Sequence, residues 1–298
     1  MPYKGIIMRK LILGAAISGA FAVSTAFAQT PAPAAPAAPA SPLSFNLGLT
    51  SNYLFRGISQ THGRPAVQGG IDYAHASGFY VGAWASSITW VKDFLGKGRI
   101  EVDVYGGYKN SFAGGGWNYD VGYITYNYPG KGGEILTVLA NPNTQELYAA
   151  IGYKWLTAKY SYATSKNFIG WYGGAALNQN TRGSDYLELN ANYDAGNGWT
   201  VIGHLGHQRV KGSVRTVGGV NDASYSDWKV GVSKDIGFGT VTAAYSDTNT
   251  SGTCTPVGAL NTNAYCWANS GFTPAVGPTA GFKDVSKGAF TLSWLKSF

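Results

Sequence analysis

The chain has 298 residues, of which 45% are hydrophobic, only 12% are charged and 42 are glycine. An aromatic share of 14% excludes a wholly disordered chain, and the glycines follow no three-residue period, which excludes collagen. Gly, Tyr, Thr and Asn dominate where a helical bundle needs Leu, Glu and Lys, so a β protein remains. The net charge of +7 falls to +4 without three basic residues of the leader, and no clustered basic groove for nucleic acid is present.

Residues 1–28 have the pattern of a secretory signal peptide. Arg9 and Lys10 form a positive start, an apolar run follows, and Ala-Phe-Ala at 26–28 gives a small-x-small cleavage site. Met8 is an alternative start, since the charges follow it directly. The apolar run is short and contains Gly, Ser and Ala, which favours a cleaved leader over a membrane anchor.

Residues 29–43 form a Pro/Ala-rich linker that we expect to lie in the periplasm. The sequence TPAPAAPAAPASP at 30–42 favours extended polyproline II and cannot build a core. Beyond it no apolar run reaches the roughly 18 residues of a membrane helix. The remaining residues, 44–298, are assigned to one further domain.

From residue 44 onward the dominant hydrophobic period is two. In IEVDVYGGYK, at 100–109, apolar residues alternate with Glu, Asp and Tyr, and 145–154 and 185–193 alternate in the same way. This pattern indicates strands with one apolar and one polar face. Strands of about ten residues are expected near 44–56, 65–74, 78–87, 99–109, 117–128, 144–154, 156–164, 184–193, 198–208, 224–234, 239–247 and 288–298.

The connections between these strands alternate in length. Short pieces such as HASG, DAGNG and DIGFG alternate with longer ones, the last of which runs from about Asp247 to Lys287. Outer-membrane barrels have short periplasmic turns and long outer loops, so a first strand that starts in the periplasm puts long loops after odd-numbered strands. The sequence follows this order, which a soluble sandwich would not explain.

Aromatic residues near strand ends also favour a membrane barrel, because they suit the level of lipid headgroups. They are Trp117, Tyr119, Tyr153, Tyr193, Trp199, Trp228 and Tyr245. In such a barrel the apolar face meets lipid and the polar face lines the lumen. We therefore expect 44–298 to form an all-β, transmembrane up-and-down antiparallel β-barrel of about 12 strands in the bacterial outer membrane.

The C-terminal segment AFTLSWLKSF resembles the signal read by the outer-membrane assembly machinery of Gram-negative bacteria, which favours a final aromatic and alternating apolar residues. Phe290, Leu292, Trp294 and Phe298 lie on one face, whereas Lys296 departs from the pattern. A long Lys side chain can still reach toward headgroups. The resemblance implies that the machinery recognises Phe298.

The segment FNLGLTSNYLFRGISQTHGRPAVQGGIDY, at 45–73, resembles the opening of TorF-type porins of proteobacterial outer membranes. The similarity continues through GFYVGAWASSI at 78–88 and IEVDVYGGY at 100–108, and only the alternating pattern is shared beyond them. The resemblance implies an outer-membrane channel, and it supports location more firmly than substrate.

On this register the lumen carries charged residues of both signs, which are candidate pore-lining residues. They are the acidic Asp72, Glu101, Asp103, Asp120, Glu146, Glu188 and Asp227, the basic Arg56, Lys109, Lys154, Lys159 and Lys229, and His204. A polar pore with a mild cation preference and an internal ion-pair network that plugs the barrel both fit this set. Twelve strands lie between a filled barrel of eight and an aqueous one of sixteen, so width does not decide between them.

The predicted outer loops hold an excess of basic residues over acidic ones. The excess can pair with phosphates of lipopolysaccharide, attract anionic solutes, or belong to ordinary solvated loops. Cys254 and Cys266, both in the last outer loop, are expected to form a disulfide in an oxidising compartment. No His accompanies them, so we expect no metal site, and no motif calls for a cofactor.

Catalytic motifs are lacking, since the sequence has neither HExxH nor GxSxG. The string SDWK at 226–229 matches S-x-x-K, but Ser226 and Lys229 face opposite sides of a strand. We expect no enzyme and name no catalytic residue, while a hydrolase that uses His204 stays open as a third hypothesis.

The favoured function is an outer-membrane porin-like channel for passive diffusion of small polar solutes. The alternative is a closed barrel with a structural, adhesive or lipopolysaccharide-binding role and no transport. Expected partners are outer-membrane lipid and lipopolysaccharide, small polar solutes and the assembly machinery, without nucleic acid.

Overall fold

The computed structural model describes residues 41–298, apart from 96–97, 113–115, 131–140, 172–179 and 217–218; between 251 and 280 it describes only 252, 254, 263–268, 272–273 and 277–278. The expected signal peptide, 1–28, and almost all of the expected linker, 29–43, lie outside the described residues. The first described strand begins at Leu43, within one residue of the expected domain start.

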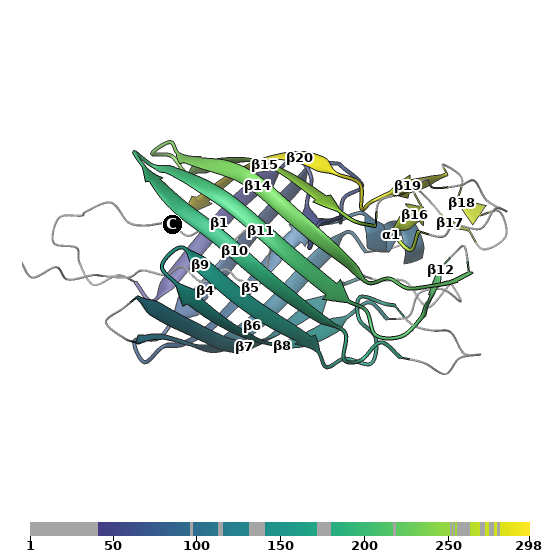
Figure 1. Cartoon of the computed structure of the whole chain (residues 1–298), viewed down its shortest axis with the longest axis horizontal. Coiled ribbons are helices and arrows are strands. Elements are labelled where there is room, and N and C mark those ends of the chain that lie inside the picture. The colour runs from purple at the N-terminus through teal and green to yellow at the C-terminus, as the bar shows by residue number, and fades with distance from the viewer. Residues whose placement is uncertain are drawn as a thin grey trace, which may run out of the picture.

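Twelve long strands form a closed antiparallel barrel in the order β1-β20-β15-β14-β11-β10-β9-β8-β7-β6-β5-β4 (Figure 1). The strands are β1 Leu43–Thr50, β4 Ala66–Ala74, β5 Phe79–Ser87, β6 Ile100–Phe112, β7 Trp117–Asn127, β8 Thr144–Tyr153, β9 Leu156–Ala163, β10 Asp185–Gly196, β11 Trp199–Arg209, β14 Tyr225–Asp235, β15 Thr240–Thr248 and β20 Ala289–Ser297. Neighbours in sequence pair around the ring, and β1 pairs with both β4 and β20. The predicted up-and-down barrel is confirmed.

Short elements gather at one end of the barrel, on the right of Figure 1, which we call the loop end. They are α1 Trp90–Leu95, β2 Leu54–Phe55, β3 Ile58–Ser59, β12 Val214–Thr216, β13 Gly219–Asn221, β16 Cys266–Ala268, β17 Phe272–Thr273, β18 Gly277–Pro278 and β19 Phe282–Asp284. Short turns such as 154–155 and 197–198 join strands at the opposite end, the turn end. In the part of the chain that the structure describes, no helix is long and apolar enough to cross a membrane.

The outer wall of the barrel is apolar. Large hydrophobic side chains such as Leu147, Leu187 and Leu205 alternate with inward polar ones and are exposed by 52%, 56% and 62%. Aromatic rings follow one another around the turn end: Trp117 contacts Tyr153 at 4.6 Å between ring centroids, and the rings of Phe112 and Trp117 and of Trp155 and Tyr193 also meet. Soluble monomeric proteins rarely expose a continuous apolar surface of this kind, so such a wall marks a surface that contacts a partner or a membrane.

Inside the wall, tyrosines cover glycines of the paired strand. Tyr105 on β6 is paired with Gly82 on β5, and a Cβ at Gly82 would stand 2.5 Å from the Tyr105 ring. Tyr80 covers Gly107 in the same way across the same strand pair, with its hydroxyl 2.6 Å from that Cβ position. A ring that covers a glycine fills the space the missing side chain leaves against the sheet.

The first strand is shorter than expected, and this is the one large departure from the predicted boundaries. The pattern predicted a strand over 44–56, whereas β1 ends at Thr50. Residues 51–65, which we call the inward loop, leave the wall and form the hairpin β2–β3. Its two turn residues, Arg56 and Gly57, both have positive φ, at 48° and 79°. A two-residue hairpin with this geometry needs a residue pair of the X-Gly kind.

Candidate functional site

The inward loop lies inside the barrel at the loop end and contacts strands on several sides. Tyr53 donates to Glu101 on β6 at 2.6 Å, and Phe55 packs against Tyr126 on β7 at 5.4 Å between ring centroids. Tyr225 on β14 donates to the backbone oxygen of Arg56 at 2.8 Å. The loop therefore bridges the lumen from β6 to β14.

Gly57 lets the inward loop approach the wall closely. A Cβ there would stand 2.8 Å from Thr248 Cγ2 on β15 and 2.9 Å from Asp227 Cβ on β14. Its φ of +79° adds a second reason for glycine, because other residues rarely take this conformation. The tip of the hairpin is thus held against β14 and β15.

Arg56 lies at the tip of the hairpin in the inward loop. Its Nη1 and Nη2 donate to the two oxygens of Glu146 on β8 at 3.0 and 2.7 Å, and Nη1 also donates to Gln208 on β11 at 2.8 Å. The guanidinium lies 4.3 Å from the ring centre of Tyr186 and 4.8 Å from that of Phe55. A buried bidentate pair between rings fixes both position and orientation of the arginine.

Three acidic side chains of the wall lie at the same level. Glu101 and Asp103 on β6 and Glu146 on β8 are almost fully buried. Tyr126 donates to Glu146 at 3.2 Å, which adds to the pairing with Arg56. Neither carboxylate oxygen of Asp103 has a hydrogen-bond partner within the described ranges. This level of the lumen is acidic and closely packed.

A polar network centred on His204 links β10, β11 and β14. Its Nε2 is 2.9 Å from both Asp227 Oδ1 and the Tyr186 hydroxyl, and Tyr186 donates to Asp227 Oδ2 at 2.8 Å. Its Nδ1 is 2.7 Å from Asn190 Oδ1, and Asn190 donates to Glu188 at 2.9 Å. Every polar group in this network therefore has at least one partner, which stabilises the wall on this side.

A second network lies on the opposite wall, on strands β4 to β9. Tyr105 donates to Asp72 at 2.6 Å, and Tyr80 donates to Asp120 at 2.6 Å and also contacts the Tyr148 hydroxyl. Two lysines sit over these rings: Lys109 is 5.0 Å from the centre of Tyr80, and Lys159 is 4.5 Å from that of Tyr148. Charges of both signs thus line this wall.

The structure places the sequence-predicted lumen residues in three settings. Arg56 belongs to the inward loop instead of a strand, and Lys154 lies in the exposed turn 154–155 beside the ring of Tyr153. The other candidates stand at inward positions of barrel strands: Asp72, Glu101, Asp103, Lys109, Asp120, Glu146, Lys159, Glu188, His204, Asp227 and Lys229. All but Lys229 belong to the groups above, and Lys229 on β14 is paired with His204 on β11. Lys154 is thus the one candidate that lies away from the lumen.

Sequence reasoning missed the tyrosines that hold these charged groups. Tyr80, Tyr105, Tyr126, Tyr148 and Tyr186 all occupy inward positions and donate to, or lie against, the charged side chains. Their inward parity was available from the alternation, and several stand opposite an inward glycine. A tyrosine on the polar face of a predicted strand was therefore the sequence feature that could have identified these residues.

Described residues of the last loop, which spans 249–288, pack on the inward loop from outside. Ser59 donates its backbone N–H to the oxygen of Val285 at 2.8 Å, and Lys283 donates to the oxygen of His62 at 2.6 Å. Cys254 and Cys266 form a disulfide in this loop, 12 residues apart in sequence. The inward loop is therefore packed between the lumen and the last loop.

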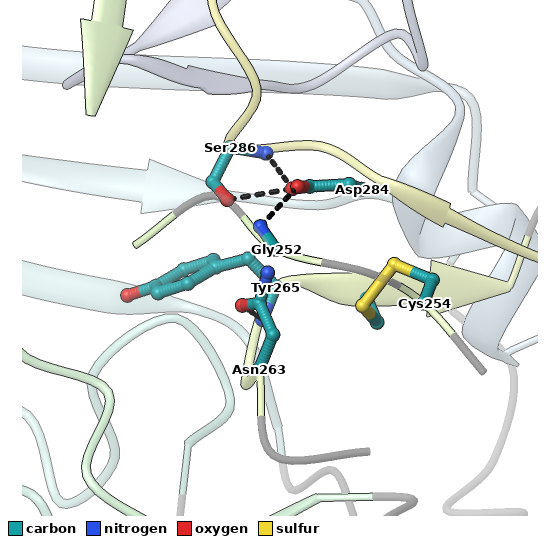
Figure 2. The surroundings of a disulfide bond; sticks show 7 residues. Gly252, Cys254, Asn263, Tyr265, Asp284 and Ser286 are labelled. Carbon is teal, nitrogen blue, oxygen red and sulfur yellow. Dashed lines mark hydrogen bonds between the residues drawn. A yellow bond between two sulfur atoms is a disulfide. The ribbon is translucent and has the colours of Figure 1, made fainter. Parts of the chain in front are cut away.

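Hydrogen bonds around the disulfide order the base of the last loop (Figure 2). Asp284 accepts from the Ser286 backbone N–H at 2.9 Å, from the Ser286 hydroxyl at 2.6 Å and from the backbone N–H of Gly252 at 2.7 Å. Cys266 pairs with Asp284 in the β16–β19 ribbon. The disulfide thus joins residue 254 to the ribbon that contacts the inward loop.

His62 lies at the junction of the inward loop, α1 and the last loop. Its Nδ1 is 2.8 Å from Thr89 Oγ1 and 3.3 Å from Asp93 Oδ2, and its ring is 6.4 Å from that of Trp267 between centroids. The side chain is buried, and its φ is 54°. The three segments meet at this residue.

Burial lowers the pKa of His62 from 6.5 to about 4. The nearby cations Lys283, Arg64 and Lys92 lower this pKa further, while Asp93 opposes them. His62 is therefore neutral at neutral pH, and its 3.3 Å contact with Asp93 there joins a neutral ring and a carboxylate.

Solved structures with a similar arrangement include an outer-membrane channel and a porin. An outer-membrane channel from Pseudomonas putida F1 is 12% identical, with a TM-score of 0.47 over 90% of this chain and 100% of that one. The KdgM porin is 8% identical, with a TM-score of 0.44 over 86% and 97% of the two chains. Pseudomonas aeruginosa OprD is 12% identical, with a TM-score of 0.39 over 86% and 66%. No solute or mechanism carries over at these values.

No curated protein sequence matches this chain significantly. The resemblance to TorF-type porins stays a prediction, because the family that matches carries another name. A family model described as a bacterial protein of unknown function, Gcw_chp, matches residues 34–269. The chain therefore belongs to the Gcw_chp family.

Proposed function

We propose that this chain is a porin-like channel of the bacterial outer membrane for passive diffusion of small polar solutes. The observation that carries the proposal is the contrast between the two faces of one closed barrel. The outer face is apolar and has an aromatic row at the turn end, as a lipid-facing wall needs. The inner face carries charged, amide and hydroxyl side chains, as an aqueous path needs.

The proposed orientation places the turn end in the periplasm and the loop end outside the cell. The first and last barrel strands, β1 and β20, have their outer termini at the turn end, and the six long connections are at the loop end. Bacterial outer-membrane barrels have this arrangement of turns and loops. The signal peptide expected at 1–28 supports export through the periplasm.

The inward loop sets the proposed size limit of the channel. A solute that enters from the loop end meets the Arg56–Glu146 pair and the rings around it before it reaches the partly exposed polar residues near the turn end. A narrow section with fixed charges of both signs passes small polar molecules and rejects large or apolar ones.

Planar-bilayer conductance of the refolded chain tests this proposal. We expect discrete single-channel steps, and a variant whose residues 53–60 are replaced by a Gly/Ser linker should conduct several-fold more, because the narrow section is removed. A folded protein that gives no steps in either form would overturn the proposal. A turn variant, Lys154→Ala, serves as the control and should conduct as the native chain does.

A closed barrel with a structural or adhesive role is the second candidate. It is favoured by the burial of the inward loop, where Tyr53, Arg56 and Ile58 are at most 4% exposed. This reading predicts a silent native chain and conductance only after the inward loop is replaced. The same two recordings therefore separate the two candidates.

We also propose that the outer-membrane assembly machinery recognises the exposed C-terminal aromatic residue of this chain. Phe298 is 67% exposed while its backbone pairs with Phe45. Phe298→Ser should lower the amount of folded protein in the outer membrane without changing the stability of refolded protein. Unchanged membrane yield would contradict this role.

A further inference from the structure

One part of the loop-end rim carries basic and phenolic side chains on the outward face. Tyr162 on β9, Asp185 on β10 and Arg209 on β11 are paired directly across the three strands. They have the same parity as the exposed outward residues Leu187 and Leu205. This row therefore faces away from the lumen and ends the apolar wall, at the level where lipid headgroups begin.

Gly183, two residues before β10, lies at the centre of this group. A Cβ on Gly183 would stand 3.1 Å from the Tyr162 hydroxyl and 3.5 Å from Cδ of Lys211, and its φ is +85°. Nη2 of Arg209 donates to its backbone oxygen at 3.2 Å, and Arg182 precedes it in sequence. We call Tyr162, Arg182, Arg209 and Lys211 the rim patch.

The rim patch has unused hydrogen-bond donors. Arg209 donates through Nη2 to Gly183 and to Asp185, and its side chain is 53% exposed. Across the described ranges, no other guanidinium nitrogen of Arg209 has a hydrogen-bond partner, and neither the Lys211 ammonium nor the Arg182 guanidinium has one. Of the three basic residues, only Arg209 is paired with a carboxylate among the described residues, that of Asp185, and all three basic residues are exposed.

We propose that the rim patch binds the phosphate group of a lipid in the outer leaflet. Guanidinium and ammonium groups with a neighbouring phenol supply charge-assisted donors that suit phosphate oxygens. Leu187, Leu205 and Tyr160 continue the outward wall below the patch, where acyl chains can pack. This continuity with the apolar wall favours a lipid over a free phosphate ion, since basic sites beside apolar walls recognise lipid headgroups.

The proposal rests on the membrane location in the proposed function but not on conduction. A closed barrel needs the same contact with the outer leaflet as an open one does. The experiment therefore measures lipid binding and conductance on the same preparations.

Native mass spectrometry of the detergent-solubilised full chain, with diphosphoryl lipid A as the probe, tests the rim patch. We expect one retained lipid in the native chain and about tenfold weaker binding in the double variant Arg209→Ala/Lys211→Ala, because charge-assisted hydrogen bonds are lost. Lys211→Ala alone removes a side chain with no hydrogen-bond partner across the described ranges, so it should weaken binding without affecting the fold.

The matched control is the double variant Arg64→Ala/Lys287→Ala, which removes the same charge from exposed residues near β4 and β20. It should bind the lipid as the native chain does. Equal loss in both double variants would overturn the rim patch in favour of general charge attraction. Full binding of lipid A without phosphates would overturn the role of phosphate, and displacement by millimolar inorganic phosphate would overturn the lipid as the ligand.

The two proposals fail separately. A native chain that conducts in discrete steps but retains no lipid overturns the rim patch alone. Specific lipid retention by a barrel that never conducts supports the rim patch and overturns the channel alone.

Discussion

The two halves of the lumen are built from the same kind of wall but differ in what fills them. At the loop end, wall residues such as Glu101, Glu146 and Gln208 are at most 1% exposed, because the inward loop packs against them. At the turn end, inward residues such as Asn46 and Asn118 are partly exposed. The comparison teaches that the burial of polar wall residues at the loop end comes from one inserted hairpin and not from the strands.

The largest effect expected from this difference is at the Arg56–Glu146 pair. Arg56→Ala leaves Glu146 as an uncompensated buried charge, and we expect a loss of about 3–5 kcal/mol in the free energy of unfolding. Urea unfolding of refolded protein measures this loss. Replacing both partners, Arg56→Met with Glu146→Leu, should restore most of it, since an apolar pair has no charge to leave unpaired. A single variant as stable as the native chain would show that the pair does not hold the inward loop.

The next effect concerns the last loop that covers the inward loop. Replacing both Cys254 and Cys266 by Ser removes a cross-link between residues 12 apart in sequence, for which chain entropy predicts about 3 kcal/mol. We expect faster protease cleavage of the loop end, measured by mass spectrometry of the fragments, and an unchanged turn end. A reducing agent should reproduce this in the native chain and leave the Ser variant unaffected.

The pH dependence should also come from the loop end, through His62. Its folded-state pKa, about 4, is below the unfolded value of 6.5. As pH falls through this interval, the unfolded chain takes up the proton first, so stability is full above about pH 6.5 and decreases toward pH 4, by about 3 kcal/mol in total. Urea unfolding at pH 7 and pH 5 measures the decrease. Asn tolerates the positive φ at this position, so His62→Asn should remove this part of the pH dependence. If the variant loses as much stability between pH 7 and pH 5 as the native chain does, the decrease comes from another group.

The smallest effect is expected where a tyrosine covers a glycine in the wall. Gly82→Ala places a methyl group against the Tyr105 ring and displaces its hydroxyl from Asp72, at a cost of about 1–2 kcal/mol. Gly203→Ala is the matched control, because its Cβ would stand 3.6 Å from Ala191 with no closer neighbour. Thermal unfolding should separate the two variants. Equal unfolding midpoints for the two variants would mean that the position of the Tyr105 ring does not depend on a glycine at 82.

The barrel itself could be predicted from the sequence because each strand carries its own evidence. Alternation over ten residues gives the face of every side chain, and the lengths of connections give the direction of every strand. Neither signal depends on contacts far away in sequence. For this reason most predicted strands agree with the structure to within a few residues at each end.

The inward loop could not be predicted in the same way. Its partners Glu146 and Gln208 are 90 and 152 residues from Arg56, and no local pattern reports such contacts. Tyr53 and Phe55 keep the apolar parity of β1, although Ser51 and Leu54 break it, and this extended the predicted strand too far. The Arg56-Gly57 pair was the one local sign of a tight hairpin. Lys154 was assigned to the lumen because the turn after β8 begins one residue earlier than expected.

The mutual backbone hydrogen bonds of Phe45 and Phe298, at 2.9 and 3.2 Å, have a consequence for assembly. A sheet that lacks β20 presents two open edges, on β1 and β15, each able to pair with another chain. Because β20 contacts both edges, one strand removes both hazards in a single event. Both edges stay open to pairing with other chains until β20 binds them. Insertion of this protein should therefore proceed as an all-or-none closure, and aggregation should compete with it until β20 docks.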